Sequence, residues 1–189
     1  MTRIAIALTP DFADWEPALL TAVARSYLGV EVVTASPDGL AVTSMGGLKV
    51  LPDMAYGDLD AGSFDALVIP GGLIWENGGE APDFRPLVNA FHDKGKVVAG
   101  ICAAASVLAS TGVLDKVAHT GNRLEAHAEH KGYHGKALYR DQPRAVSDGK
   151  IVTAAGSSPV SFTMEVLKAL DLWGPEAEAE LAAFSAEHR

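Results

Sequence analysis

The single cysteine of the chain, Cys102, lies where a short apolar run meets small, helix-forming residues, in the sequence VVAGICAAAS at residues 97–106. In a parallel α/β protein this pattern predicts a sharp turn from a buried strand into a helix. The first N–H groups of that helix would point at the sulfur and favour the thiolate over the thiol. Because a thiolate is a nucleophile, we expect chemistry at Cys102. The alternative is a small buried hydrophobic residue, the usual role of a free cysteine.

An acidic side chain could assist this sulfur. Glu16 follows the first apolar run of the chain, in DFADWEPALL at residues 11–20. If its carboxyl group points inward and stays protonated, it can donate a hydrogen bond to the thiolate and transfer protons. The alternative is an exposed acid in a first helical turn, where the helix dipole favours it.

A pair of glycines supplies further candidates. Gly71 and Gly72 follow the apolar sequence ALVIP, and glycine permits close backbone approach and unusual dihedral angles. Their N–H groups, with that of Ala103, could form an oxyanion hole for a tetrahedral intermediate or for a cysteine-bound oxygen. An ordinary loop turn is the alternative.

Apolar runs alternate with amphipathic stretches along the chain. Strands that are apolar throughout, separated by helices, indicate a mostly parallel central sheet with both faces covered. We therefore predict the α/β class and a flavodoxin-like three-layer α/β/α sandwich. Ligands bind at the carboxyl ends of such strands, which brings residues 9–16, Gly71, Gly72 and Cys102 to one edge. Besides the strand and helix around Cys102, we expect strands at residues 3–8, 30–35, 66–70, 116–119 and 150–154, helices at 15–28, 83–94, 161–170 and 176–188, and a hairpin over 40–52.

Length and composition exclude several classes of function. A length of 189 residues fits one domain over residues 1–189. The formal charge of −9, with no basic run to offset it, argues against a nucleic-acid partner. No apolar stretch is long enough to span a bilayer, so we expect no membrane association. One cysteine cannot form an internal disulfide, and the start MTRIAIALTPDF lacks the features of a secretory signal, so we expect a cytoplasmic protein.

Taken together, these motifs resemble the ThiJ/PfpI family, within the class I glutamine amidotransferase-like superfamily. The resemblance rests on ALVIPGG, on AGICAAASVLASTGVL some thirty residues later, on the acid after the first strand and on KIVTAAGSSPVSFTMEVLKAL, and it covers residues 3–173. It implies that Cys102 is a nucleophile on a strained elbow and that Glu16 is its carboxyl partner. It also implies oxyanion N–H groups at Gly72 and Ala103, and a homodimer.

The chain departs from the family pattern at two places. PfpI-type proteases have a histidine directly after the cysteine, where this chain has Ala103, so a Cys-His protease mechanism has no local support. The deglycase-like branch has a histidine in a loop beyond the following strand. His119, in KVAHTGN, is the best match for it, and Asn122 is a rival. His119 could instead be a loop histidine that makes one backbone hydrogen bond.

Two tryptophans and a group of histidines complete the candidate residues. Trp15 and Trp75 would give the pocket an apolar wall if both lie at the edge of Cys102. In GNRLEAHAEHKGYHG, a continuous helix would place three histidines on one face, a possible zinc or nickel site, but Gly132 interrupts that helix. We expect a solvated, mobile segment over the active-site edge, with no metal and no other cofactor. The three histidines are His127, His130 and His134.

Two functions use the same residues, and the sequence does not separate them. The first is a cysteine-dependent enzyme acting on a small carbonyl or amide substrate, as a hydrolase or hydratase or in the manner of a glyoxalase or deglycase. The second is a sensor of oxidants or a protective protein, in which Cys102 is oxidised to the sulfinate without turnover. A third possibility is a structural or chaperone-like dimer in which the cysteine is incidental.

Overall fold

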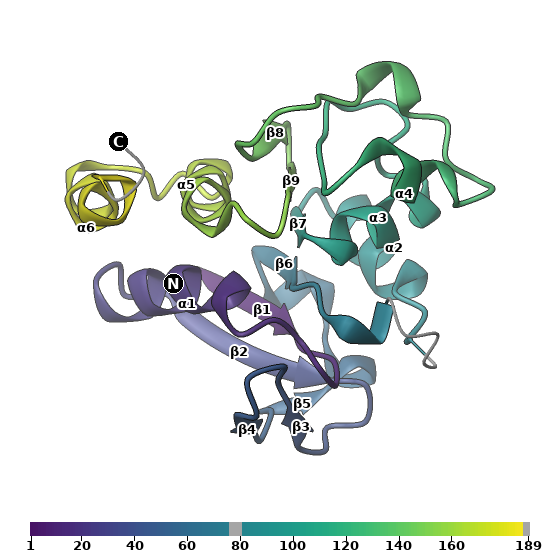
Figure 1. Cartoon of the computed structure of the whole chain (residues 1–189). Coiled ribbons are helices and arrows are strands. Elements are labelled where there is room, and N and C mark those ends of the chain that lie inside the picture. Colours follow the sequence, from purple (N-terminus) through teal and green to yellow (C-terminus); the bar gives the residue numbers. More distant parts are fainter. Residues whose placement is uncertain (76–80, 187–189) are drawn as a thin grey trace.

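The computed structural model describes residues 1–75 and 81–186, which are built around a seven-stranded sheet (Figure 1). The strand order is β5-β2-β1-β6-β7-β9-β8, and every neighbouring pair is parallel except the antiparallel pair β8–β9. The predicted α/β class with a mostly parallel, flavodoxin-like sheet is confirmed. The strands are β1 (Arg3–Ala7), β2 (Glu31–Ser36), β5 (Met54–Ala55), β6 (Ala66–Ile69), β7 (Val97–Ile101), β8 (Val146–Asp148) and β9 (Ile151–Ala154).

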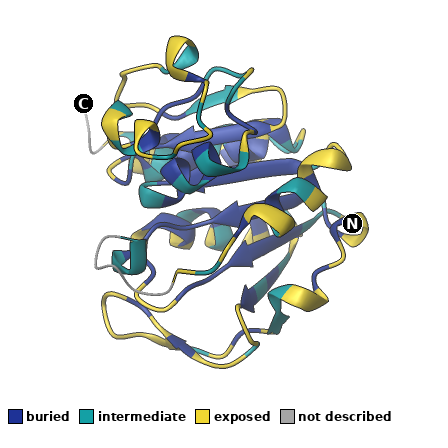
Figure 2. Cartoon of the chain, turned by 90° about the vertical axis from the view of Figure 1, so that its right-hand side faces the viewer, coloured by how far each residue is buried: buried dark blue, intermediate teal, exposed yellow. Residues whose placement is uncertain are grey.

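Helices cover both faces of this sheet. On one face, Leu20, Phe162 and Leu181 join a single hydrophobic cluster with the strands. On the other face, Val88 and Leu108 join a second cluster. Figure 2 shows the result, with buried strands between layers whose outer surfaces are exposed. The first layer contains α1 (Trp15–Ser26), α5 (Pro159–Ala169) and α6 (Pro175–Ala186), and the second contains α2 (Arg85–Asp93) and α3 (Ala103–Thr111), with the short helix α4 (Leu124–Ala128) packed on α3.

The central strands are apolar because both of their faces are covered. Every residue of β6, β7 and β9 is buried. A polar side chain at these positions would lose its hydration on either face. Mostly apolar runs without polar alternation are the consequence. The one polar residue in these three strands, Thr153, accepts a hydrogen bond from the N–H of Thr120 at 2.8 Å.

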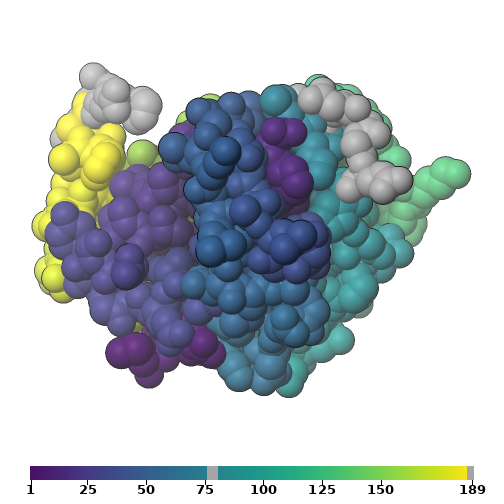
Figure 3. All heavy atoms as spheres, turned by 90° about the horizontal axis from the view of Figure 1, so that it is seen from below, coloured from purple at the N-terminus to yellow at the C-terminus, as the bar shows by residue number. Residues whose placement is uncertain are grey.

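A small hairpin lies outside the main sheet, as the sequence predicts. Strands β3 (Val42–Thr43) and β4 (Lys49–Val50) pair antiparallel, and Gly47 between them has φ +87°, a conformation that favours glycine. Figure 3 shows residues 40–60 filling the middle of the face seen from below, with α6 at its margin. Single 3-10 turns connect other elements: η1 (Tyr56–Asp58), η2 (Ala61–Ser63), η3 (Leu73–Trp75) and η4 (Lys136–Leu138).

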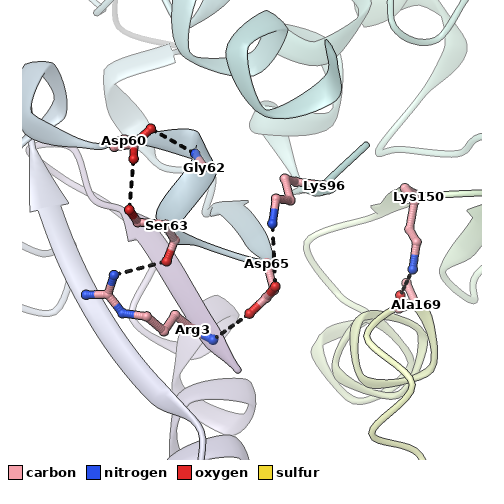
Figure 4. A network of polar contacts seen from close by, with 8 residues as sticks. All are labelled: Arg3, Asp60, Gly62, Ser63, Asp65, Lys96, Lys150 and Ala169. Carbon is pink, nitrogen blue, oxygen red and sulfur yellow. Dashed lines mark hydrogen bonds and ion pairs between the residues drawn. The ribbon is translucent and has the colours of Figure 1, made fainter. Parts of the chain in front are cut away.

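The amino ends of the central strands are joined by polar contacts (Figure 4). The backbone N–H of Arg3 donates to Asp65 at 3.0 Å, and Lys96 Nζ lies 3.6 Å from the same carboxylate. Lys150 Nζ donates to the carbonyl of Ala169 at 2.6 Å. These charged residues stand at the starts of β1, β6, β7 and β9, so the opposite, carboxyl edge of the sheet is left for a binding site.

The structure corrects some of the predicted elements. Residues 116–119 do not form a strand, because the chain there makes only one isolated bridge, between His119 and Tyr139. The antiparallel edge strand β8 and the helix α4 were not predicted. Helix α6 reaches Ala186, and the predicted end of that helix at residue 188 lies outside the described residues. Within the described ranges, no helix is long and apolar enough to cross a membrane.

Candidate active site

Cys102 occupies a strained turn between β7 and α3. Strand β7 ends at Ile101 and α3 begins at Ala103, as the sequence predicts. The backbone of Cys102 has φ 60° and ψ −128°, a region that costs a non-glycine residue about 1–3 kcal/mol. Its N–H donates to the carbonyl of Ala154 at 2.9 Å, which fixes the turn to the end of the neighbouring strand β9. The sulfur is held at the carboxyl edge of the sheet.

Close contacts leave no room for a side chain at either of the two glycines that follow β6. A Cβ on Gly71 would lie 2.7 Å from Cys102 Cβ, and one on Gly72 would lie 2.3 Å from the carbonyl oxygen of Asp11. The N–H of Gly71 donates to Glu16 Oε2 at 2.6 Å. The prediction that this N–H serves an oxyanion hole is therefore wrong, because it positions the carboxyl group instead. The N–H groups of Gly72 and Ala103 remain the predicted donors to an oxyanion.

Glu16 points inward rather than into solvent. It lies in the first turn of α1 and is fully buried. One carboxyl oxygen accepts the hydrogen bond from Gly71, and the other, Oε1, has no nitrogen or oxygen partner among the described residues and faces the sulfur of Cys102. A buried carboxyl group next to a half-buried thiol can exchange a proton with it.

Gly156 forms a wall of the site that the sequence analysis missed. A Cβ at this position would lie 2.8 Å from Cys102 Sγ and 3.1 Å from Glu16 Oε1. The N–H of Gly156 donates to Asn122 Oδ1 at 2.9 Å, and its carbonyl accepts from Trp15 Nε1 at 2.9 Å. Its position just after β9, next to β7 in the sheet, is the signal that could have placed it.

Asn122, and not His119, contacts the cysteine. Asn122 Nδ2 donates to Cys102 Sγ at 3.3 Å. Both ring nitrogens of His119 are bonded elsewhere: Nδ1 to the carbonyl of Val117 at 2.8 Å and Nε2 to the hydroxyl of Tyr133 at 2.7 Å. The structure therefore does not bring His119 to the sulfur, and the histidine is a buried member of an aromatic cluster. Since an amide takes up no proton near neutral pH, Asn122 can support the sulfur but cannot act as its base.

The two tryptophans lie on different sides of the site. Trp15 is half-exposed and bonds to the carbonyl of Gly156. Trp75 lines a cavity together with Ala103 and Asn122, and its ring packs against Phe84 with centroids 5.5 Å apart. Each provides an apolar surface close to Cys102.

Burial governs the ionisation of the Cys102–Glu16 pair. Burial raises the pKa of Glu16 to about 7, although the hydrogen bond from Gly71 lowers it. Burial and then the charge of an ionised Glu16 raise the pKa of Cys102, while the hydrogen bonds from Asn122 and the Ala103 N–H lower it by less. The predicted lowering of this pKa by the helix N-terminus is therefore outweighed by burial, and further by the charge of Glu16 when that group is ionised. The two groups do not both ionise near neutral pH, so the pair holds at least one proton and loses the other near pH 7.

The three histidines near residue 130 do not converge. His127 is fully buried, which corrects the expectation of a solvated segment at this residue. Its ring stacks on His119 with centroids 5.6 Å apart. His130 lines the cavity beside Cys102, whereas His134 is exposed. Within residues 1–75 and 81–186, no group of three side chains has an arrangement suited to a metal ion.

Known proteins share both the sequence pattern and the fold. The model of the DJ-1/PfpI family matches residues 2–169. Among solved structures, the DJ-1 superfamily protein Atu0886 from Agrobacterium tumefaciens is 68% identical, with a TM-score of 0.98 and coverage of 100% of both chains. This agreement includes the strands and loops that place Cys102 and Glu16 at one edge.

Relatives that carry functional names are more distant. The "Uncharacterized protease YoaZ" of Bacillus subtilis (strain 168) is 34% identical over 172 residues, which are 87% of this chain and 81% of that protein. The "Glutathione-independent glyoxalase DJR-1.2" of Caenorhabditis elegans is 25% identical over 173 residues, 90% of this chain and 89% of that protein. With a family match over most of its length and a near-complete structural counterpart, this chain belongs to the DJ-1/PfpI family.

Proposed function

We propose that this protein is a cysteine-dependent enzyme that acts on a small carbonyl or amide compound, as a hydrolase or hydratase or in the manner of a glyoxalase or deglycase. One observation carries the proposal: the carboxyl group of Glu16 is buried against the sulfur of Cys102 on a strained elbow. A buried acid beside a nucleophile is costly for stability, and such costs are typical of catalytic sites.

The negative charge of the pair is better solvated on the sulfur than on the carboxylate. A thiolate at Cys102 receives N–H donors from Asn122 and Ala103, and the helix N-terminus of α3 adds to them. A carboxylate at Glu16 receives the N–H of Gly71 and the S–H of Cys102, which is a weak donor. A proton on Glu16 would also complete a hydrogen bond to the thiolate. We infer that the reactive form is Cys102 thiolate with protonated Glu16.

This form can attack a carbonyl carbon without an external base. The Sγ–C bond forms, the π electrons of the C=O bond move to its oxygen, and that oxygen takes the proton from Glu16. The N–H groups of Gly72 and Ala103 are the candidate donors for the developing charge on the oxygen. With an amide substrate, the C–N bond of this adduct then breaks, the amine leaves with the hydroxyl proton, and a thioester remains on Cys102. Glu16, now a carboxylate, takes a proton from water while the hydroxide adds to the thioester carbon. Cleavage of the Sγ–C bond then releases the acid and restores the thiolate, with the proton on Glu16. Proteolysis is not proposed, since the position after the cysteine is Ala103.

The glyoxalase name of the Caenorhabditis elegans relative supports a carbonyl substrate. The test is turnover of methylglyoxal and of small amides by the purified protein and by Cys102→Ser. We expect the substitution to reduce kcat/KM at least about a hundred-fold, with an unchanged melting temperature to show that the variant folds. Turnover that survives in Cys102→Ser would overturn the proposal.

A second candidate function is oxidation of Cys102 to the sulfinate without turnover. It is favoured by Glu16 Oε1, a buried oxygen that faces the sulfur without a nitrogen or oxygen partner. Its protonated form could donate to a sulfinate oxygen. Dilute peroxide followed by intact mass measurement tests this function. Addition of two oxygens, absent in Cys102→Ser, supports it, and further oxidation to the sulfonate under the same conditions contradicts it.

We also propose that the protein acts as a homodimer in the cytoplasm, with a small molecule or an oxidant as its partner. A reducing compartment keeps a single thiol available for chemistry. The homodimer is tested by light scattering during size-exclusion chromatography, where a mass near that of one chain, 19.7 kDa, contradicts it.

A further inference from the structure

A cavity of about 450 Å³ lies beside Cys102, between α3 and α4. Ala103 and Asn122, which donate hydrogen bonds to the sulfur, form part of its wall. The side chains of Arg123 and Glu129 also line it and are mostly exposed, at 66% and 71%. Arg123 therefore lies on the wall of a cavity that is also lined by two direct neighbours of the sulfur, Ala103 and Asn122.

Among the described residues that line this cavity, Arg123 is the one whose side chain carries a permanent positive charge. Burial lowers the pKa of His130, the other basic residue of the wall, so His130 is neutral near pH 7. The contact between Arg123 and Glu129 spans 4.0 Å. An exposed pair at this distance contributes little, so Glu129 does not prevent Arg123 from binding another anion.

The backbone that carries Arg123 is held in place even though the guanidinium is exposed. The carbonyl of Arg123 accepts from His127 Nδ1 at 3.2 Å, and the carbonyl of Gly121 accepts from the hydroxyl of Tyr139 at 3.2 Å. Between them, Asn122 bonds to both Gly156 and Cys102. The guanidinium therefore extends from a backbone whose position relative to the sulfur is fixed.

We propose that Arg123 binds a carboxylate group of the substrate, so that the site prefers small carbonyl compounds that carry a carboxylate, such as 2-oxo acids, over neutral ones. A guanidinium binds a carboxylate through two parallel N–H···O bonds, a geometry that an ammonium group lacks. A chain with a net charge of −9 repels anions in general, so a local cation at the cavity is needed to admit them. For turnover, this inference rests on the proposed function.

The first experiment needs no turnover, because it compares two alkylating agents at Cys102. Iodoacetate and iodoacetamide both form an Sγ–C bond with loss of iodide. They differ in that iodoacetate carries a carboxylate and iodoacetamide carries a neutral amide. Intact mass gives the two rates, since the chain has one cysteine. We expect Arg123→Gln to lower the ratio of the iodoacetate rate to the iodoacetamide rate about ten-fold, with the iodoacetamide rate itself nearly unchanged.

Arg25→Gln is the matched control, because it removes the same charge from α1, outside the residues that line this cavity. It should leave the ratio as in the wild type. An equal ratio in wild type and Arg123→Gln, or an equal fall in both variants, overturns the inference. If turnover is found, kcat/KM for glyoxylate relative to glyoxal should also fall in Arg123→Gln. Absence of turnover contradicts the proposed function alone, whereas an unchanged alkylation ratio contradicts the role of Arg123 alone.

Discussion

The backbone of Gly156 lies against the sulfur of Cys102, where a Cβ would come within 2.8 Å of Sγ. The same glycine donates its N–H to Asn122 and accepts from Trp15 through its carbonyl. One residue without a side chain thus positions both the hydrogen-bond donor of the sulfur and an aromatic wall of the site. This explains why β9 must end beside β7 for the site to form.

Gly156→Ala is expected to slow the reactions of Cys102. The added methyl group must displace the sulfur or the carboxyl group of Glu16, which breaks their contact. We expect alkylation by iodoacetamide at pH 7 to slow several-fold and the free energy of unfolding to fall by about 1–3 kcal/mol. Gly174→Ala is the control, because nothing lies within 4 Å of a Cβ built there. Equal alkylation rates in the two variants would contradict this account.

The pH dependence of alkylation should show which atom of the Cys102–Glu16 pair carries the charge. Burial raises the pKa of Glu16 to about 7, so the pair loses its first proton near that pH. If the negative charge left by the loss of this proton resides on the sulfur, the alkylation rate rises with pH and has its midpoint near pH 7. If the charge resides on Glu16, the thiolate appears only at much higher pH. We expect the first result, from a rate profile between pH 5 and pH 10.

Glu16→Gln separates these two cases by the sign of its effect. The amide cannot ionise, and it is a weaker donor to a thiolate than a protonated carboxyl group. We therefore expect the alkylation midpoint to move upward in this variant, and turnover to be lost because no proton is delivered. A downward shift of the midpoint would show that an ionised Glu16 had been repelling the thiolate, and the proposed reactive form would be wrong.

The sequence predicts the parts of the fold that depend on burial. The runs RIAIA, ALVI and VVAGI become strands because both faces of the sheet are covered. By contrast, β8 pairs along one side at the edge of the sheet, and its VSD sequence has no apolar pattern to reveal it. Helix α4 has five residues and depends on the burial of His127, a tertiary contact that no local periodicity encodes.

The site is predictable where a strand end places a residue and not where a loop does. The turn at Cys102 follows from the carboxyl edge of a parallel sheet, which also brings residues 9–16 to that edge but does not decide whether Glu16 points inward. The choice between His119 and Asn122 does not follow from the sheet either, because only two loop residues lie between them and packing alone decides which one reaches the sulfur. The sequence predicts an oxyanion role for the N–H of Gly71 because the actual acceptor of this N–H, Glu16, is distant in the chain.

Asn122→Asp should suppress the thiolate more than Asn122→Ala. The alanine variant removes one hydrogen bond to Sγ, whereas the aspartate also places a negative charge beside the sulfur, which raises the pKa of Cys102. We expect alkylation at pH 7 to slow several-fold in the alanine variant and about ten-fold or more in the aspartate variant. Asn89→Asp, on α2, makes the same change of charge away from the site. If Asn89→Asp slows the reaction as much, the effect is one of overall charge and not of this contact.

His127 should make the fold less stable in mild acid. Burial lowers the pKa of His127 to about 4 from an ordinary value of 6.5. The unfolded chain therefore binds a proton that the folded chain excludes, so stability is present above pH 6.5 and is lost as the pH falls toward 4. Between pH 7.5 and pH 5 this loss amounts to about 2 kcal/mol. Urea unfolding at several pH values measures it.

The comparison with His127→Gln isolates this contribution from those of other titrating groups. Glutamine keeps polar atoms near the carbonyl of Arg123 but takes up no proton. The variant is expected to be less stable than the wild type at pH 7.5, because the ring packed on His119 is lost. That difference should shrink as the pH falls to 5, because only the wild type loses the proton-linked stability. His92→Gln, at the exposed end of α2, should run parallel to the wild type. A difference between wild type and His127→Gln that stays constant with pH would mean that the buried imidazole is protonated at no cost, which its burial and its contact with His119 do not allow.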